Sequence, residues 1–157
     1  FFGFGVFGQT TEINEKTTVN VENIALMRDD GEGNPGAEIE IFKTTDFPIH
    51  CQITLDSVKS STVKKILVAV AVSGLKAETK IMTVSYKTNG EQNIVNFRGS
   101  PQNVWLAGKY RVDIFVDNRL PGNKEFTIEK SASSSAGQTN FTPKLKPKPK
   151  TKPKRKN

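Results

Sequence analysis

Apolar and polar residues alternate along much of the chain between residues 16 and 130. In the segment FPIHCQITLD, one phase holds Phe47, Ile49, Cys51, Ile53 and Leu55, and the other phase is mostly polar. An apolar residue at every second position predicts a β-strand with one buried face. The same alternation occurs in the segments KYRVDIFVD, KEFTIEK, AEIEIFK, TKIMTVSYK and NIVNFRG.

Two further segments depart from simple alternation. KILVAVAVSG is almost entirely apolar, which predicts a central strand covered on both faces. Its larger residues, such as Ile66 and Val68, define one phase, and Leu67 lies in the other. VNVENIALM changes phase between Val21 and Ile24, which predicts a bulge or two short strands.

Turn-forming residues separate these segments. Asn89-Gly90, between two expected strands, predicts a β-hairpin. Seven or eight strands, spaced about every ten residues and without a helical period, predict a single all-β domain over residues 16–130. We therefore expect an antiparallel β-sandwich.

The segment WLAGKYRVDIFVDNRLPGNKEFTIEK resembles the last two strands of immunoglobulin-like and fibronectin III-like domains. Gly108 and Tyr110 match the tyrosine corner that begins the penultimate strand of those domains. Val112 stands where antibody domains have their second cysteine, Cys51 is the only cysteine, and Trp105 precedes the corner. The resemblance implies the sandwich architecture, as in accessory modules of secreted bacterial proteins, without the disulfide. Such modules adhere, space or assemble, and the fold does not choose among these roles.

Charge is distributed very unevenly along the chain. The net charge is +7, from 23 basic and 16 acidic residues, but residues 144–157 hold eight of the basic residues and no acidic ones. The rest of the chain therefore has a net charge of −1, so the high isoelectric point gives no indication of a basic face on the folded domain. No apolar run reaches the roughly 18 residues that span a bilayer.

The beginning of the chain is apolar. Residues 1–8, FFGFGVFG, precede a polar stretch, and Gly8 lies before Gln9 at a loose signal-peptidase site. We interpret residues 1–15 as a signal-peptide remnant followed by a disordered N-terminus. Two alternatives are an apolar N-terminus that docks on the domain and a membrane-active segment.

The end of the chain is polar and then strongly basic. Residues 131–143 are rich in Ser, Ala, Gly and Thr, which predicts a flexible linker, and Asn140 begins a glycosylation sequon. Residues 144–157 repeat Lys and Pro, which predicts a disordered, extended tail. The tail offers charge without aromatic residues, so we expect it to bind polyanions without sequence preference. Its basic residues are Lys144, Lys146, Lys148, Lys150, Lys152, Lys154, Arg155 and Lys156.

Motifs for nucleotide, metal or catalytic chemistry are weak. GEGNPG, residues 31–36, matches a dinucleotide-binding glycine pattern, but an expected strand follows where that site needs a helix. The acidic loop from Asp29 to Glu32 could hold calcium, although clustered acids in a turn are more often simply solvated. His50 and Cys51 are adjacent, so on a strand they face opposite ways, with Cys51 buried and His50 at the surface. We expect neither an enzyme nor a cofactor.

Five apolar residues fall in the phase that we assign to the outside. Gathered on one sheet face they would form an interface, whereas scattered they need no partner. Leu67 and Phe115 are the candidate interface residues. The whole set is Leu67, Phe115, Phe42, Ile81 and Ile94.

Together these features predict a secreted or periplasmic, non-enzymatic binding or assembly module with a polycationic tail that anchors it to a polyanionic surface. Cell envelope, polysaccharide or nucleic acid could supply that surface. The alternative is a nucleic-acid-binding protein that acts through the tail without sequence preference. An upstream basic region followed by an apolar one would favour the first interpretation.

Overall fold

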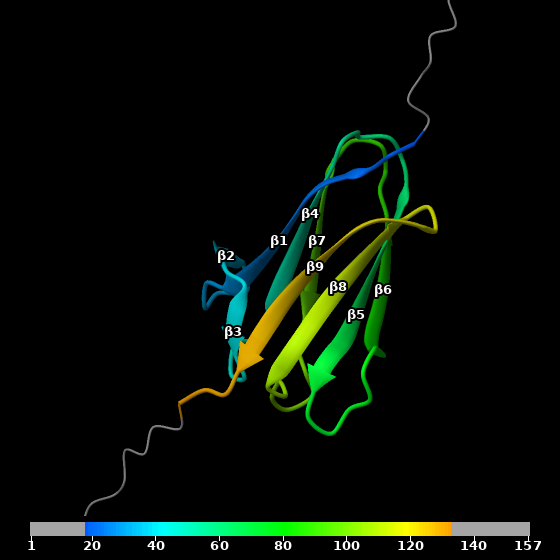
Figure 1. The fold of residues 1–157 in the computed structure, drawn as a ribbon. Coiled ribbons are helices and arrows are strands. Elements are labelled where there is room, and N and C mark those ends of the chain that lie inside the picture. The colour runs from blue at the N-terminus through cyan, green and yellow to red at the C-terminus, as the bar shows by residue number, and fades with distance from the viewer. Residues whose placement is uncertain (1–17, 133–157) are drawn as a thin grey trace, which may run out of the picture.

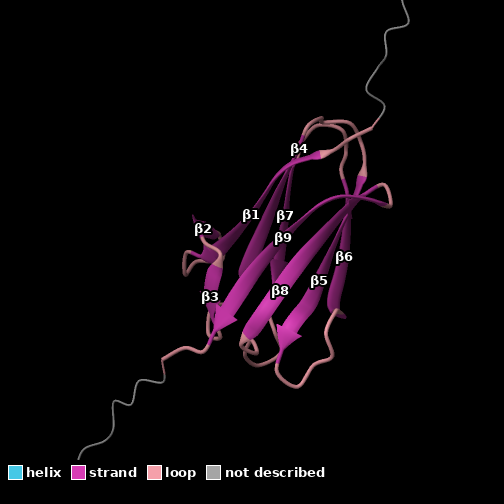
Figure 2. Ribbon diagram, viewed as in Figure 1, coloured by secondary structure: helices cyan, strands magenta, loops and turns pink. Residues whose placement is uncertain are grey.

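The computed structural model describes residues 18–132, which form two β-sheets packed face to face (Figure 1, Figure 2). The four-stranded sheet has the order β2-β1-β4-β7, and the five-stranded sheet has the order β3-β9-β8-β5-β6. The expected all-β sandwich is confirmed. The strands are β1 (Val21–Asp29), β2 (Pro35–Glu38), β3 (Ile41–Lys43), β4 (Ile49–Leu55), β5 (Thr62–Val72), β6 (Thr79–Lys87), β7 (Ile94–Gly99), β8 (Gly108–Val116) and β9 (Arg119–Glu129).

Nine strands occur rather than seven or eight because AEIEIFK, expected as one strand, divides between the sheets. The Ile39 amide donates to the Leu26 carbonyl of β1, at 2.9 Å, whereas the next carbonyl, of Glu40, accepts from the Thr127 amide of β9, at 3.0 Å. The chain therefore crosses from one sheet to the other between these residues. After the crossing, β3 pairs parallel with β9, so the sandwich is not purely antiparallel.

The prediction of a β-hairpin at Asn89-Gly90 is wrong. β6 and β7, which flank this turn, lie in different sheets and pair with β5 and β4 respectively. A hairpin forms instead at Asp117 and Asn118, between β8 and β9. Both residues have positive φ angles, 47° and 65°, as the right-handed twist of paired strands favours in a two-residue turn.

The phase assigned to β5 is also wrong. Val63, Leu67 and Ala69 face the core, and the pairing with β8 shifts between Ala69 and Ala71, so that Val72 also faces the core. Leu67 is 5% exposed and therefore cannot belong to an outer interface. The outward assignment of Phe42 fails in the same way, because this side chain is fully buried and its ring meets Phe126 edge to face.

Other expectations for the strands are confirmed. β5 is covered on both faces, since Ile66 and Val68, opposite in phase to Leu67, are also buried. The register of β1 against β4 shifts between Val21 and Asn23, where a bulge was expected. Within residues 18–132 no helix is long and apolar enough to cross a membrane.

Candidate apolar binding cleft

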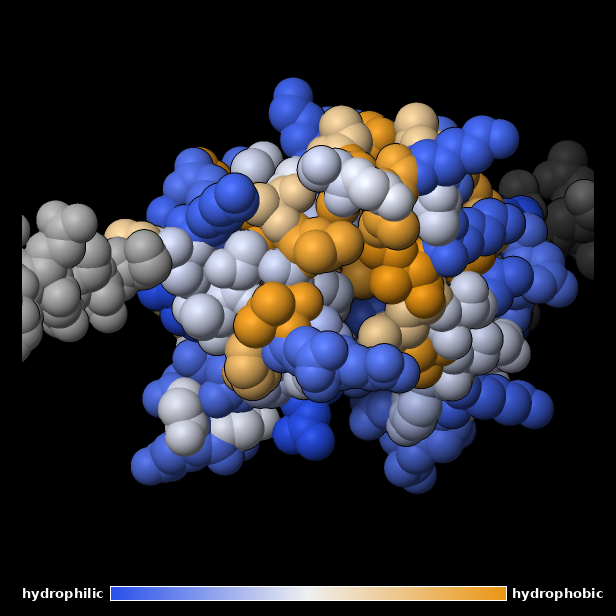
Figure 3. Space-filling model, turned by 90° about the horizontal axis from the view of Figure 1, so that it is seen from below, coloured by the Kyte–Doolittle hydropathy of each residue, from blue (hydrophilic) through white to orange (hydrophobic). Residues whose placement is uncertain are grey.

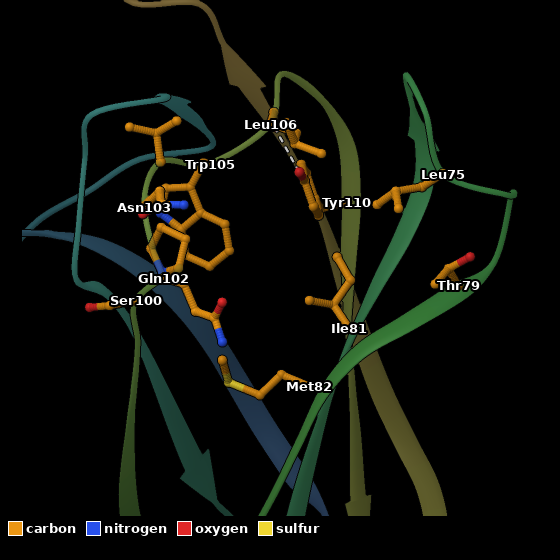
Figure 4. A pocket seen from close by; sticks show the side chains of 12 residues that line it. Leu75, Thr79, Ile81, Met82, Ser100, Gln102, Asn103, Trp105, Leu106 and Tyr110 are labelled. Carbon is orange, nitrogen blue, oxygen red and sulfur yellow. Dashed lines mark hydrogen bonds between the residues drawn. The ribbon is translucent and has the colours of Figure 1, made fainter.

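A cleft of about 550 Å³ opens at one end of the sandwich, between the loop that joins β5 to β6 and the segment that joins β7 to β8. Figure 3 views this end of the molecule, where apolar side chains gather. Figure 4 shows side chains from both walls facing each other across the opening. The apolar lining includes Leu75, Ile81, Met82, Val104, Trp105 and Leu106.

Four of these side chains are open to solvent. Their exposed fractions are 38% for Leu75, 40% for Ile81, 54% for Val104 and 50% for Leu106. Single exposed apolar residues are common, but several around one hollow indicate a binding site. Another hollow, of about 600 Å³, has only the residues Glu38–Ile41 as its lining, and two of these four are glutamates. The end cleft is therefore the better candidate.

One wall of the cleft is built on the tyrosine corner. Tyr110 is 1% exposed, and its hydroxyl donates to the carbonyl oxygen of Leu106 at 2.7 Å, the geometry that such a corner requires. The Trp105 ring contacts Tyr110 edge to face, and its Nε1 donates to the Asp46 carbonyl at 2.9 Å. Burial raises the pKa of Tyr110, so its phenol stays protonated. These bonds hold Trp105 and Leu106 at the cleft.

Gly108 allows the two strands behind this wall to approach closely. A Cβ at this position would lie 2.4 Å from the Ala71 carbonyl oxygen and 2.9 Å from the Val72 Cα, both of which are backbone atoms. No larger residue fits unless β5 or β8 moves.

The opposite wall is fixed by polar contacts of the loop between β5 and β6. The Thr79 hydroxyl donates to the Lys76 carbonyl at 2.6 Å. Glu78, with a positive φ of 62°, accepts from the Arg111 guanidinium at 2.8 Å, and this guanidinium also bonds Asp113. Both carboxylates raise the pKa of Arg111, the Asp113 hydrogen bond most strongly. These contacts fix the conformation of the loop that forms this wall.

In the acidic loop, Asp29 and Asp30 accept hydrogen bonds from backbone amides of the same loop. Asp29 Oδ1 accepts from the amides of Gly31 and Gly33, at 2.8 Å and 3.2 Å, and Asp30 Oδ1 accepts from the Glu32 amide at 2.8 Å. These bonds lower the pKa of Asp30, with the Glu32 amide as the main cause. Among the described residues, no three His, Cys, Asp or Glu side chains come together as a group that could hold a metal ion.

His50 does not lie at the surface as expected. It is 4% exposed, and its Nε2 lies 2.8 Å from Asp29 Oδ2 because the acidic loop folds over it. The His50 hydrogen bond is the main cause that lowers the pKa of Asp29. Cys51 is buried at 2% exposure, as expected, and burial raises the pKa of its thiol to about 11.

The remaining predicted site residues are dispersed or lie elsewhere. Phe115 is half-buried on the outer face of β8, with Lys64 Nζ 4.8 Å from its ring centroid, and Ile94 is exposed on the other sheet. All the basic tail positions from Lys144 to Lys156 lie outside the described residues, as do Asn140 and residues 1–15.

The sequence-based predictions missed most of the cleft residues. They singled out only Ile81 and the tyrosine corner, Gly108 and Tyr110. The other residues of the cleft come from β6 and from two loops that alternation does not cover. A usable signal was the run Val104-Trp105-Leu106, three apolar residues in a stretch that no strand pattern explains.

A solved structure shows the same fold. An immunoglobulin-like protein of Pseudomonas aeruginosa is 12% identical, with a TM-score of 0.50, over 73% of this chain and 99% of its own. An alkylpurine DNA glycosylase of Pseudomonas fluorescens, solved bound to DNA with an abasic site analogue, is 16% identical with a TM-score of 0.45 over 71% of this chain and 30% of its own. No family model and no curated protein matches the chain. Residues 18–132 thus form an immunoglobulin-like β-sandwich.

Proposed function

We propose that this protein is a non-enzymatic binding module that holds an apolar ligand in the end cleft. The observation that supports this proposal is the group of four exposed apolar side chains around one hollow of about 550 Å³. Pockets of this size and lining accommodate small organic ligands. Hydrogen bonds of Trp105, Tyr110 and Thr79 fix the walls, so we expect the cleft to be formed before a ligand arrives.

Trp105 provides a direct test, because it is the only tryptophan in the chain and lines the cleft. The full chain is titrated with decanol, a neutral apolar probe, while tryptophan fluorescence is followed. We expect a saturable change that Leu106→Asp abolishes, since a carboxylate in the cleft must be desolvated on binding.

Leu120→Asp is the matched control. Leu120 is 51% exposed, close to the 50% of Leu106, but it lies on β9 and does not line the cleft. Its variant should bind decanol like the wild type. Equal binding by wild type and Leu106→Asp, or none by either, would contradict the proposal.

We further propose that the module works outside the cytoplasm, in a secreted or periplasmic setting, and that the basic tail anchors it to a polyanionic surface. The eight basic residues of the tail support the anchor, and the apolar start of the chain supports export. Ser131, near the end of the described chain, bonds Thr44, whose carbonyl accepts from the Trp105 amide. The described part of the chain therefore ends near the cleft.

Binding of nucleic acid through the tail is the second candidate. Its support is the same positive charge, which binds any polyanion. Outside residues 144–157 the net charge is −1, so the proposal gives the sandwich no part in nucleic-acid binding.

A further inference from the structure

A lysine lies in the core of this sandwich. Lys65 occupies the inward phase of β5, between Val63 and Leu67, and is only 4% exposed. Its Nζ lies 5.5 Å from the centroid of the Phe97 ring on the opposite sheet. Within residues 18–132 the structure gives Lys65 no hydrogen bond or ion pair, and its Nζ, although the residue is buried, retains some accessible surface. Lysine is rarely buried without a partner, because its ammonium group loses its hydration.

The surroundings of Lys65 offer little compensation for this loss. The cation–π contact with Phe97 recovers part of it. Cys51 is the ionisable neighbour, but its thiol stays neutral at physiological pH because burial raises its pKa to about 11. Burial lowers the pKa of Lys65 itself. Among the described residues, the Lys65 ammonium group therefore has no anionic partner.

Lys65 lies next to the end cleft. Lys65 lines a small inner cavity of about 20 Å³ that shares Met82 and Trp105 with the cleft. A Cβ on Gly99 would lie 3.7 Å from Lys65 Nζ and 3.8 Å from Met82 Sδ, so the ammonium group and the thioether reach the same spot. Met82 therefore lies between the inner cavity and the cleft. Its unbranched side chain can change rotamer at small cost.

We propose that the ligand of the cleft is a carboxylate amphiphile whose alkyl chain lies in the cleft and whose carboxylate passes Met82 to pair with Lys65. This inference rests on the proposed apolar site and adds the chemistry of the head group. The cleft supplies the apolar surface for the chain, and Lys65 supplies a buried positive charge beside it. Pairing in a water-poor cavity restores the interactions that the ammonium group lost on folding.

The test compares head groups on one alkyl chain. Decanoate, decanol and decylamine are titrated into the full protein, and dissociation constants are measured by calorimetry. We expect decanoate to bind about tenfold or more tightly than decanol, since a hydrogen bond to a charged group contributes about 1.5–3 kcal/mol. Decylamine, which carries the same charge as Lys65, should bind more weakly than decanol.

Two variants assign the preference to Lys65. Lys65→Met keeps the length of the side chain without its charge and should remove the preference for decanoate while decanol still binds. Lys64→Met is the matched control, because Lys64 is the next residue on β5 and its Nζ lies over Phe115 on the outer face. This control variant should retain the preference and also keeps the basic tail.

The outcomes separate the two proposals. If decanol binds and decanoate binds no more tightly, or if Lys65→Met keeps the preference, the role of Lys65 is wrong and the apolar cleft stands. If none of the three probes binds, the proposed cleft itself fails. The wild-type comparison of head groups needs no variant, so misfolding of Lys65→Met would leave the proposal falsifiable.

Discussion

At the scale of single residues, the corner between β7 and β8 combines a close backbone approach with a buried phenol. Gly108 lets β8 lie against the end of β5, and Tyr110 then stacks on Phe126 with ring centroids 5.5 Å apart. The hydroxyl of Tyr110 fixes the Leu106 carbonyl. The position of the cleft wall therefore depends on Gly108 and Tyr110.

Gly108→Ala tests the close approach. The added methyl group would lie 2.4 Å from the Ala71 carbonyl oxygen, so β5 or β8 must shift. We expect the free energy of unfolding to fall by about 2–4 kcal/mol, as for overpacking against rigid backbone. Urea denaturation measures the change, and Gly74→Ala is a control for backbone strain, since Gly74 has a positive φ of 83° and open space around it. A loss no greater than that of the control would contradict the steric argument.

Tyr110→Phe tests the hydroxyl. Removal of the donor leaves the Leu106 carbonyl without this bond in a partly buried place, so stability should fall by about 1–3 kcal/mol. Ring packing on Phe126 remains. A denaturation midpoint equal to that of the wild type would show that the hydrogen bond does not stabilise the corner.

Lys65→Met tests the buried cation by stability. Removal of an unpaired buried charge should raise the free energy of unfolding at pH 7 by about 1–3 kcal/mol. Because burial lowers the pKa of Lys65 in the folded state, the penalty is fully present below that folded pKa. It fades as pH rises toward 10.5, the usual value for lysine. The gain from Lys65→Met should therefore shrink from pH 7 to pH 10, which urea denaturation at several pH values measures. A gain that is absent at pH 7, or constant with pH, would contradict an unpaired charge at this position.

At the scale of elements, the loop between β1 and β2 acts as a cover for His50. Asp29 connects the two parts, since one carboxylate oxygen accepts backbone amides of the loop and the other lies 2.8 Å from His50 Nε2. His50, expected at the surface, is buried by this loop. The loop therefore stabilises the outer face of the four-stranded sheet.

Asp29→Asn tests this cover. The pKa of Asp29 is lowered in the folded state, so its contribution to stability is present above about pH 4 and is lost as pH falls through the folded pKa. The wild type should therefore be more stable than Asp29→Asn at pH 7, and the difference should shrink at pH 2–3. Thermal unfolding at both pH values measures this, and a difference that does not change with pH would argue against a charged contact.

The strands themselves were predictable because alternation reports directly which face is buried. Three features were not predictable from the alternation of apolar and polar residues. The crossing between β2 and β3 depends on partners from β1 and β9, the phase of β5 is altered by a bulge near Val70, and the Asn89-Gly90 turn joins strands in different sheets. For the site, the corner was recognisable from Gly108 and Tyr110, because a motif marks it. The cleft walls were not predictable, because β6 and the two loops that form them come together only after folding.

At the scale of the whole molecule, our proposal assigns apolar ligands to the cleft and polyanions to the basic tail. Deletion of residues 144–157 should abolish binding to DNA, RNA and heparin-like polymers and leave the melting temperature and decanol binding unchanged. With eight basic residues, the log–log salt slope on duplex DNA should be no steeper than about −7. Binding isotherms at several salt concentrations, with two unrelated DNA sequences, measure this. Preference for one sequence, or binding by the truncated protein, would favour a nucleic-acid function of the body.

The most direct test of the binding cleft is methyl-resolved NMR of the full chain during a titration with decanol. We expect chemical-shift changes at Leu75, Ile81 and Leu106, which line the cleft, and none at Ile94 or Leu120, which are exposed elsewhere. Decanol carries no charge, so the result does not depend on Lys65 or on the tail. Shifts at Ile94 and Leu120 equal to those at the cleft residues, or no shifts at all, would contradict the claim that this end of the sandwich is a binding site.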